Sequence, residues 1–278
     1  MDGILLVHKP VHMTSHDVVN RARKLLHTKK IGHCGTLDPD ASGVLVLCVG
    51  KATKALQFLM SEEKEYIATL SLGSSTDTYD ASGKVIEIKA FHGVDHVDDI
   101  LKSFIGKQQQ YPPIYSAIKV NGKKLYEYAR NNETVDIKPR DIEIKEIELL
   151  SQQGHLITFR VKCSKGTYIR SLCVDIAKKM GYPGHMSELI RTKSGEFHLK
   201  DCYDLEELEE GKYKLLSLEE AFCSFEQYVV DDENIVYHGK LIKSDIDHQV
   251  VIVNKSGQVL AVYGPNGKGY LKSIRGLF

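Results

Sequence analysis

The chain has 278 residues, of which 42% are hydrophobic and 27% charged, and its formal net charge is zero. This composition is ordinary for a globular protein with a real core, and the length suits one large domain with a small one, or two medium ones. No apolar run approaches the roughly 20 residues needed to cross a bilayer. The apolar start "GILLV" is too short for a secretory signal and is interpreted as a first strand.

The zero net charge hides a segregation of charges along the chain. Lys and Arg outnumber Asp and Glu by 4 in residues 1–60 and by 6 in residues 111–200. The acids are in excess by 4 in residues 61–110 and by 6 in residues 201–278. A local basic excess can serve a phosphate backbone even in a neutral protein, but an ordinary solvated surface is the simpler interpretation of charge alone.

The first sixty residues predict two strands and two helices. Residues 3–10 predict a short strand, and residues 14–27 predict an amphipathic helix that Thr14 or Ser15 can cap. The apolar run "VLVLCVG" predicts a buried strand, and a second helix is expected from Thr53.

The middle of the chain predicts alternating strands and tight turns. Residues 64–73 and 155–164 alternate between apolar and polar positions, which is typical of half-buried strands. Between them, "STDTYDASG" predicts a turn into the hairpin strand "KVIEI" and lacks the spacing of a calcium loop. A second hairpin is predicted at "VNGK", followed by a short helix, and "TYIRSLCVDIAKKMG" predicts a helix that ends at Gly181.

The last third predicts a change of architecture. Residues 204–224 are acidic with a helical pattern, and short strands with Gly and Asn turns follow from about residue 229. We therefore expect one domain over residues 1–228 and a small one over residues 229–278, which is short enough to pack on the main body. Strands linked by hairpins, with helices between them, predict an α+β fold with a mostly antiparallel sheet.

The segment "GHCGTLDPDASG" places Asp38 at the entrance of a buried strand. Pro39 restricts Asp38 to extended backbone conformations, and the glycines allow a large group to approach the chain closely. Composition alone favours a structural turn in which Asp38 accepts a backbone hydrogen bond. The alternative is a carboxylate that is held in place for chemistry.

Other candidate residues also have a plain structural interpretation. Arg170 is either a surface arginine or the partner of a carboxylate, and Tyr66 is either a core-edge tyrosine or a ring that packs on a ligand. His33 is either polar surface or a contact to a base or phosphate. Cys34 is a weak candidate nucleophile, because no histidine is visibly placed to activate it.

Several common signatures are missing from the sequence. It contains no P-loop and no G-x-G-x-x-G after the first strand, which argues against nucleotide-driven transfer and against dinucleotide redox chemistry, respectively. It also contains no H-E-x-x-H, a motif of zinc hydrolases, and no G-x-S-x-G, a motif of serine hydrolases. The six cysteines form no C-x-x-C pair and no cluster at zinc spacing, so we expect them to be reduced, cytosolic and mostly structural.

Five blocks, taken in order, resemble the TruB family of tRNA pseudouridine synthases. They are "LLVHKPVHMTSHDVV", "GHCGTLDPDASGVLVLCVGKATK", "KEYIATLSLGSSTDTYDASGKV", "PPIYSAIKVNGKKLYEYAR" and "CSKGTYIRSLCVDIA", within about residues 4–195. The resemblance implies a pseudouridine synthase fold, with helices flanking a mixed sheet, and a short PUA-like RNA-binding domain at residues 229–278. It implies a cytoplasmic monomer that converts uridine 55 in the T loop of tRNA to pseudouridine, binds the T-arm stem-loop, and uses no cofactor, no metal and no membrane.

The resemblance also implies roles for single residues. Asp38 matches the catalytic carboxylate, which either attacks the sugar or assists loss of a ribose proton, and Arg170 matches the arginine that pairs with it. Tyr66 matches the tyrosine that packs on the target base. The base pocket and the everted loop would be held by Tyr168, Leu189 and His33. Candidates for phosphate contact are Arg21, Arg23, Lys24, Lys29, Lys30, Lys119, Lys123 and Lys124, the last three within an RNA-contacting insertion at residues 106–142.

These roles agree with the chemistry of a buried base. A base within a structured loop must be flipped out before its glycosidic bond can be reached, and an apolar aromatic pocket would receive it. A lone carboxylate in such a pocket tends to protonate, and a guanidinium partner counters this.

The sequence differs from the family pattern at two places, and two other functions are possible. His12 stands where the family usually has glycine, and "LIR" near residue 190 stands where the family usually has L-R-R. One alternative is a catalytically silent RNA-binding or RNA-folding module with the same surface. The other is a glycoside hydrolase, which needs a second acid, and Asp40 is the nearest candidate for it.

Overall fold

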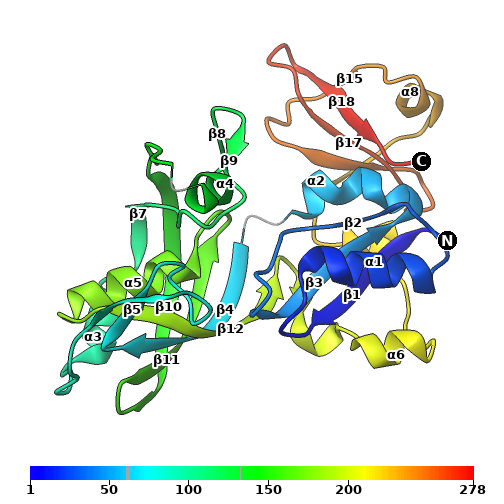
Figure 1. Cartoon of the computed structure of the whole chain (residues 1–278). Coiled ribbons are helices and arrows are strands. Elements are labelled where there is room, and N and C mark those ends of the chain that lie inside the picture. Colours follow the sequence, from blue (N-terminus) through cyan, green and yellow to red (C-terminus); the bar gives the residue numbers. More distant parts are fainter. Residues whose placement is uncertain (61–62, 132) are drawn as a thin grey trace. The chain divides into compact units, whose positions relative to one another are not determined.

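The computed structural model describes residues 1–60, 63–131 and 133–278. The chain divides into two compact units, and most of their elements are labelled in Figure 1. The first unit contains Met1–Asp38, Val44–Met60 and Glu196–Phe278, and the second contains Pro39–Gly43 and Ser61–Gly195. In the described part of the chain, no helix is long and apolar enough to cross a membrane.

The N-terminal part of the first unit alternates strands and helices. Its elements are β1 (Gly3–Lys9), α1 (Ser15–Leu25), β2 (Ile31–His33), most of β3 (Ser42–Val49), the 3₁₀ helix η1 (Gly50–Ala55) and α2 (Leu56–Leu59). β1 lies beside β3, and β2 pairs with β3 in antiparallel register. The two predicted strands and the first helix are confirmed. The predicted second helix forms only as a 3₁₀ segment followed by one α-helical turn.

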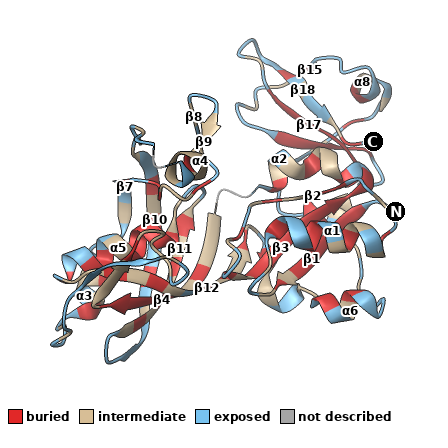
Figure 2. Cartoon of the chain, in the orientation of Figure 1, coloured by how far each residue is buried: buried red, intermediate tan, exposed pale blue. Residues whose placement is uncertain are grey.

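Strand β3 is buried on both faces, as the unbroken apolar run predicts. Val44 and Val46 pack into one hydrophobic cluster, whereas Leu45 and Leu47 pack into another on the opposite side of the sheet. Successive side chains of a strand point to opposite faces, so a strand between two cores must be apolar at every position. Figure 2 shows β1 and β3 as almost wholly buried.

The turn between β1 and α1 holds a residue in an unusual conformation. His12 has φ 63°, in the left-handed region that glycine enters without cost. Histidine is among the residues that tolerate this region best, so the turn keeps the conformation that the family's glycine would supply. Lys9 Nζ donates to the carbonyl oxygens of Pro10 and Met13 and closes the turn.

Residues 196–278 complete the first unit. The elements are β13 (Phe197–His198), η2 (Leu199–Asp201), α6 (Leu205–Glu209), α7 (Leu218–Ala221), β14 (Gln227–Val229), α8 (Asn234–Tyr237), β15 (Ile242–Lys243), β16 (Val250–Val253), β17 (Val259–Pro265) and β18 (Tyr270–Gly276). The last five strands form a sheet in the order β14-β16-β17-β18-β15, in which only β14 is parallel to its neighbour. The predicted change to short strands is confirmed. The predicted helix over residues 204–224 is interrupted, because Gly211 has φ 74° and Leu216 pairs with Ile4.

The C-terminal sheet shares a hydrophobic core with the N-terminal strands of the same unit. Val251, Val262 and Leu277 belong to the same buried cluster as Ile4 and Leu6 of β1. A segment of about fifty residues is too small to build a sufficient core alone, which explains why it packs on the rest of the unit.

A histidine in the loop before β16 gives a testable pH dependence. His248 Nδ1 lies 3.0 Å from Asp247 and its Nε2 lies 2.6 Å from Glu226, and these carboxylates raise the pKa of His248 above its usual 6.5. The stabilisation is therefore complete below about pH 6.5 and is lost as pH rises through the folded-state pKa. We expect the difference in Tm between the wild type and His248→Gln to shrink between about pH 6 and pH 8.5. A constant difference would contradict this assignment.

The second unit is built on an antiparallel sheet. Its elements are β4 (Glu63–Leu72), β5 (Ser74–Thr76), β6 (Val85–Ile88), α3 (Val97–Lys102), β7 (Gly106–Gln110), β8 (Lys119–Val120), β9 (Lys123–Lys124), α4 (Leu125–Arg130), β10 (Arg140–Gln153), β11 (Leu156–Ser164), α5 (Ile169–Lys179) and β12 (Gly184–Ser194). The strand order is β12-β4-β11-β10-β7, and α5 packs against β12 and β4. Both predicted hairpins, both predicted half-buried strands and the predicted helix that ends near Gly181 are confirmed.

Strands β7, β10 and β12 were not predicted, and β10 and β12 contain irregularities. The register of β12 against β4 shifts between Met186 and Glu188, and that of β10 against β11 shifts between Ile144 and Glu146. An extra residue of this kind reverses the inside–outside alternation, so the period of 2 that marks a strand is lost from the sequence.

A close backbone approach fixes one glycine in this unit. Ser42 and Gly43, the first residues of β3, pair in parallel with Ile190 and Arg191 of β12. A Cβ atom at Gly43 would collide with the backbone of Arg191, and Gly43 has φ 112°. Only glycine therefore fits at this position.

Candidate active site

The loop that carries Asp38 is fixed by a side chain of α1. The Leu37 N–H donates to Ser15 Oγ at 2.9 Å, and Ser15 Oγ donates to the Leu37 carbonyl at 3.1 Å. Ser15 is only 2% exposed. Thr14 caps α1, and its Oγ1 accepts a hydrogen bond from the Asp17 N–H. The pair "TS" therefore starts the helix and holds the backbone immediately before Asp38.

Tyr66 and Leu189 lie on one face of the second unit's sheet. Tyr66 of β4 is opposite Arg191 of β12, and Ala68 is opposite Leu189. Directly opposite residues project to the same face, as do alternate residues of one strand. Tyr66 and Leu189 are therefore diagonal neighbours, and they are only 8% and 7% exposed.

Helix α5 packs on that same face. A Cβ atom at Gly184 would clash with Ala177 of α5 and lie 3.1 Å from Leu70 Cδ1, and Leu70 shares a face with Tyr66. Tyr168 is the N-cap residue of α5, and Arg170 lies in its first turn. The fold thus brings four predicted site residues of the second unit to one face of the sheet and the helix that covers it.

The Arg170 guanidinium is buried and held by three groups of the second unit. Its Nη1 donates to the Thr78 carbonyl at 3.0 Å, and its Nη2 donates to the Tyr115 carbonyl at 3.1 Å. Nη1 also lies 3.4 Å from Asp80 Oδ2 in an ion pair, and Arg170 is 5% exposed. A buried charge needs such partners to offset its desolvation. The interpretation of Arg170 as a surface arginine is therefore wrong.

Asp80 is a site residue that the sequence did not identify. Its segment was predicted as a turn, and the turn is present: Asp80 Oδ1 accepts hydrogen bonds from Thr78 Oγ1 at 2.7 Å and from Ser82 Oγ at 2.6 Å. The second carboxylate oxygen faces Arg170. Tyr79, between Thr78 and Asp80, has φ 66°, a strained value for a bulky residue. Such strain is common where a backbone is held for function.

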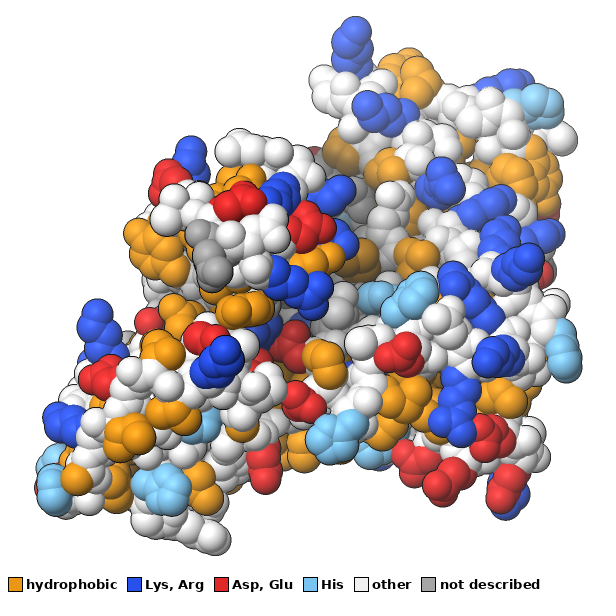
Figure 3. All heavy atoms as spheres, in the orientation of Figure 1, with side chains coloured by type: hydrophobic (Ala, Val, Ile, Leu, Met, Phe, Trp, Pro, Cys, Tyr) orange, Lys and Arg blue, Asp and Glu red, His pale blue; other side chains and the backbone are white. Residues whose placement is uncertain are grey.

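The predicted phosphate contacts of the first unit separate into two groups. Arg21 donates to Glu209 through Nε at 2.7 Å, and Arg23 donates to the Ile31 carbonyl at 3.1 Å, so both have protein partners. Lys24, Lys29 and Lys30 are exposed. Figure 3 shows basic side chains over α1 and acidic side chains over α6 of the same unit. The exposed lysines are the better candidates for phosphate contact.

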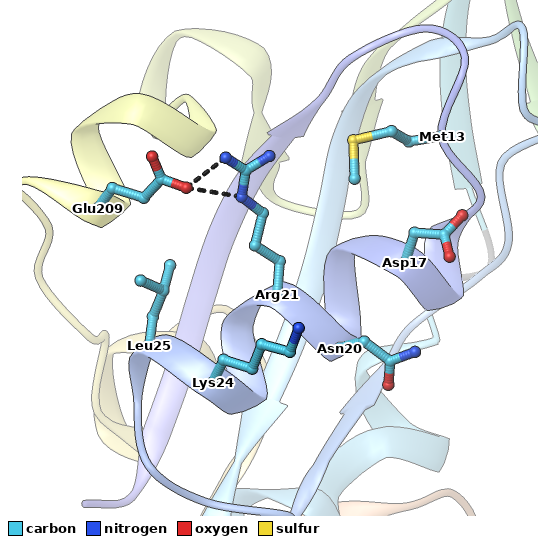
Figure 4. Close-up of a pocket in the computed structure, with 7 residues that line it drawn as sticks. All are labelled: Met13, Asp17, Asn20, Arg21, Lys24, Leu25 and Glu209. Atoms are coloured by element: carbon cyan, nitrogen blue, oxygen red, sulfur yellow. Dashed lines mark hydrogen bonds and ion pairs between the residues drawn. The ribbon is translucent and has the colours of Figure 1, made fainter.

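Arg21 and Glu209 line a hollow beside α1. The cavity has a volume of about 420 Å³. Figure 4 shows the apolar and charged side chains that line it. Its lining residues are Met13, Asp17, Asn20, Arg21, Lys24, Leu25 and Glu209. None of the predicted catalytic residues lines it, and its arginine is neutralised by its glutamate. The cavity is therefore not the candidate active site.

The basic residues of the predicted insertion are interleaved with tyrosines. Lys123 Nζ lies 2.7 Å from Glu133 and 4.7 Å from the centre of the Tyr128 ring. Lys124 donates to Tyr126 Oη at 3.2 Å, and Lys119 is exposed. Aromatic and basic side chains together suit a nucleic-acid surface, although Glu133 already neutralises Lys123.

The cysteines have structural surroundings. The Sγ atoms of Cys34 and Cys48 lie 3.8 Å apart and both residues are buried. The hydrogen bond shared with Cys34, together with burial, raises the pKa of the Cys48 thiol, and burial raises the pKa of Cys163 to about 12. Thiols in such sites stay protonated and unreactive. Among residues 1–60, 63–131 and 133–278, no group of three or more His, Cys, Asp and Glu side chains is arranged to hold a metal ion.

Comparison with solved structures supports the pseudouridine synthase fold. A chain in the crystal structure of a Cbf5–Nop10–Gar1 complex aligns with a TM-score of 0.76 and 26% identity, covering 99% of this chain and 85% of that chain. A chain of an H/ACA RNP bound to a substrate RNA containing 2′-deoxyuridine shares the fold, with a TM-score of 0.75 and 24% identity, and the coverage is 99% and 85%.

Comparison of sequences identifies the family. Residues 23–169 match the model of the TruB family pseudouridylate synthase N-terminal domain, and residues 170–229 match that of the tRNA pseudouridylate synthase B C-terminal domain. The tRNA pseudouridine synthases B of Bacillus cereus (strain ATCC 10987 / NRS 248) and Bacillus subtilis (strain 168) are each 44% identical, covering 99% of this chain and 97% of those proteins. The chain therefore belongs to the TruB family and is an isomerase that converts uridine to pseudouridine in tRNA.

Proposed function

We propose that the enzyme acts on uridine 55 in the T loop of tRNA, with Asp38 as its catalytic carboxylate. The observation that carries the proposal is the shared face of the second unit, where Tyr66 and Leu189 lie on the side of the sheet on which α5 packs. Tyr168 and Arg170 lie at the start of that helix. This face offers an apolar and aromatic surface for a flipped base, and a fixed guanidinium at its edge. The clamped backbone before Asp38 gives the carboxylate a defined position.

The reaction is an isomerisation in which all atoms are conserved. The N1–C1′ bond of the nucleotide breaks, the uracil turns, and a C5–C1′ bond forms while C5 loses a proton and N1 gains one. Asp38 acts on the ribose, and Arg170 favours the ionised form of that carboxylate through its positive charge. Tyr66 packs on the base and assists proton transfer at C5.

The remaining contacts hold the tRNA. Lys24, Lys29, Lys30 and Lys119 are exposed cations that suit phosphate oxygens. His33, at the end of β2, holds the everted loop. The insertion at residues 106–142 and the C-terminal sheet at residues 229–278 provide further RNA-binding surface.

We also infer that the enzyme works as a monomer in the cytoplasm. Its six cysteines are thiols that form no disulfide, and four of them are buried, which suits a reducing compartment. Gel filtration with light scattering would test the monomer, and a mass of two chains would contradict it.

One experiment tests the choice of substrate site. The protein is incubated with an unmodified T-arm stem-loop, and pseudouridine is mapped by chemical adduct and primer stop. The matched control carries cytidine in place of uridine 55 and keeps every other uridine. We expect one new stop, at position 55, which is absent from the control RNA. A stop at another uridine in both RNAs would contradict the T-loop assignment.

The Ser15 clamp gives a further prediction. Ser15→Ala leaves the buried N–H and carbonyl of Leu37 without their partner, so the free energy of unfolding should fall by about 1–3 kcal/mol. The turnover rate should fall as well, because the backbone before Asp38 is released. Urea unfolding and turnover on the T-arm stem-loop measure the two effects.

Thr14→Ala is the matched control for Ser15→Ala. It removes the cap of the same helix at a cost of about 1 kcal/mol but leaves both hydrogen bonds to Leu37 in place. Turnover by Thr14→Ala should therefore stay close to the wild-type rate. Equal turnover losses in the two variants would show that helix stability, and not the clamp, controls the rate.

A further inference from the structure

The side chain of Gln110 binds both backbone groups of Tyr168. Its Oε1 accepts a hydrogen bond from the Tyr168 N–H at 2.8 Å, and its Nε2 donates to the Tyr168 carbonyl at 3.1 Å. Gln110 is the last residue of β7 and is only 4% exposed. The orientation of the carboxamide is unambiguous, because an N–H requires an acceptor and a carbonyl requires a donor.

This pair of hydrogen bonds fixes the backbone of the residue at which α5 starts. Tyr168 is the N-cap residue of α5, has an extended backbone with φ −98° and ψ 110°, and provides no side-chain cap. The Gln110 carboxamide bonds the N–H and the carbonyl of Tyr168, as a residue of a paired antiparallel strand does. It thereby fixes the peptide planes on both sides of Tyr168. Rotation of either plane would turn the Tyr168 ring and shift the first turn of α5.

Two further hydrogen bonds connect the same segments. Ser171 Oγ donates to the Tyr111 carbonyl at 2.8 Å, and Arg170 Nη2 donates to the Tyr115 carbonyl at 3.1 Å. The chain that leaves β7 is therefore bonded to the start of α5 at Gln110, Tyr111 and Tyr115. Gln110 is the only one of these three that contributes its side chain, which makes it the point where a substitution can test the connection.

We propose that Gln110 is a positioning residue for the isomerisation, which sets the direction of the Tyr168 ring and the Arg170 guanidinium by holding the backbone of Tyr168. The inference rests on the proposed roles of Tyr168 and Arg170. Because Gln110 is buried, it acts through Tyr168 and not through contact with RNA. Its loss therefore lowers the rate of the chemical step and leaves RNA affinity nearly unchanged.

The first test compares Gln110→Met with Gln108→Met. Methionine has a similar length but forms neither hydrogen bond, so the single-turnover rate at saturating T-arm RNA should fall by about 10–100-fold, with a change in Kd below about threefold. Gln108 lies in the same strand and donates to the Phe104 carbonyl at 2.6 Å. The Phe104 ring contacts Lys179, at the end of α5 opposite to Tyr168. Gln108→Met should retain the wild-type rate.

The second test uses pH to restore the clamp. In Gln110→Glu, a protonated carboxyl presents one donor and one acceptor as glutamine does, whereas a carboxylate has no donor and repels the Tyr168 carbonyl. Burial disfavours the carboxylate, whereas Arg140, opposite on β10, and Arg170 of α5 favour it. We expect the rate relative to wild type to rise about tenfold or more as pH falls from about 8 to about 5.5.

The outcomes separate this inference from the proposed function. If the wild type modifies the T-arm RNA but Gln110→Met matches its single-turnover rate, the positioning role is wrong and the proposed function stands. A pH-independent rate ratio for Gln110→Glu, with circular dichroism showing a folded protein throughout, also overturns it. If the wild type leaves the T-arm RNA unchanged, the proposed function itself has failed.

Discussion

Asp38→Asn is expected to lower turnover on the T-arm stem-loop by about 10⁴-fold or more, as the loss of a group that acts directly in the chemistry usually does. Asparagine has nearly the same shape as aspartate, so the loop that Ser15 holds should keep its conformation. Its amide can neither act as a nucleophile on the ribose nor take a proton from it. Single-turnover assays with mapped pseudouridine measure the loss.

Binding measurements complete this prediction. The Kd of Asp38→Asn for the same RNA should remain within about fivefold of wild type, because the phosphate contacts are unchanged. Asp40→Asn, two residues along the same loop and exposed, is the matched control and should retain turnover. If Asp38→Asn still forms pseudouridine, the catalytic assignment is wrong. If the wild type binds the RNA without forming pseudouridine, the protein acts on this RNA as a binding or folding module only.

Arg170→Ala is expected to lower the single-turnover rate by about 10²–10³-fold, the usual effect of removing one fixed charge from an active site. It should also lower the free energy of unfolding by about 2–4 kcal/mol, because Asp80 and the carbonyls of Thr78 and Tyr115 lose their shared donor. The chemical step should suffer more than RNA binding. A rate equal to wild type at saturating RNA would exclude a role for Arg170 in the reaction.

A double-mutant cycle with Asp80 separates the two effects. Asp80→Asn keeps the hydrogen bonds that its oxygen accepts from Thr78 and Ser82 but removes the charge that faces Arg170. If the two side chains act as a unit, the loss of rate in the double variant, expressed as free energy, should be smaller than the sum of the losses in the two single variants. Strictly additive losses would mean that Asp80 affects the rate independently of Arg170.

Local signals in the sequence were sufficient for much of the fold. The cap at Thr14, the strict alternation from Tyr66 to Leu72 and the turn at Asn121 and Gly122 each depend on neighbouring residues, and all are present in the structure. Strands β10 and β12 escaped prediction because their irregular registers break the alternation. A pattern of period 2 cannot survive an inserted residue.

The candidate site shows the same limit for side chains. Thr78 and Ser82 account for Asp80 as a turn residue, so nothing in its neighbourhood indicates a second partner. That partner, Arg170, lies 90 positions later in the chain, and only the folded sheet and helix bring the two together. Gln110 was missed for the same reason, since its partner Tyr168 is 58 residues away. Long-range pairs of this kind form only in the tertiary structure, and local sequence patterns carry no information about them.

The core that β1 shares with the C-terminal sheet has a consequence for how the protein is made. Ile4 and Leu6 leave the ribosome about 270 residues before Leu277, which belongs to the same cluster. Until the C-terminal sheet has been made, one apolar face of β1 is only partly covered and remains open to chaperones and to aggregation. A premature stop near residue 229 should therefore yield an insoluble product, and not a shorter working enzyme.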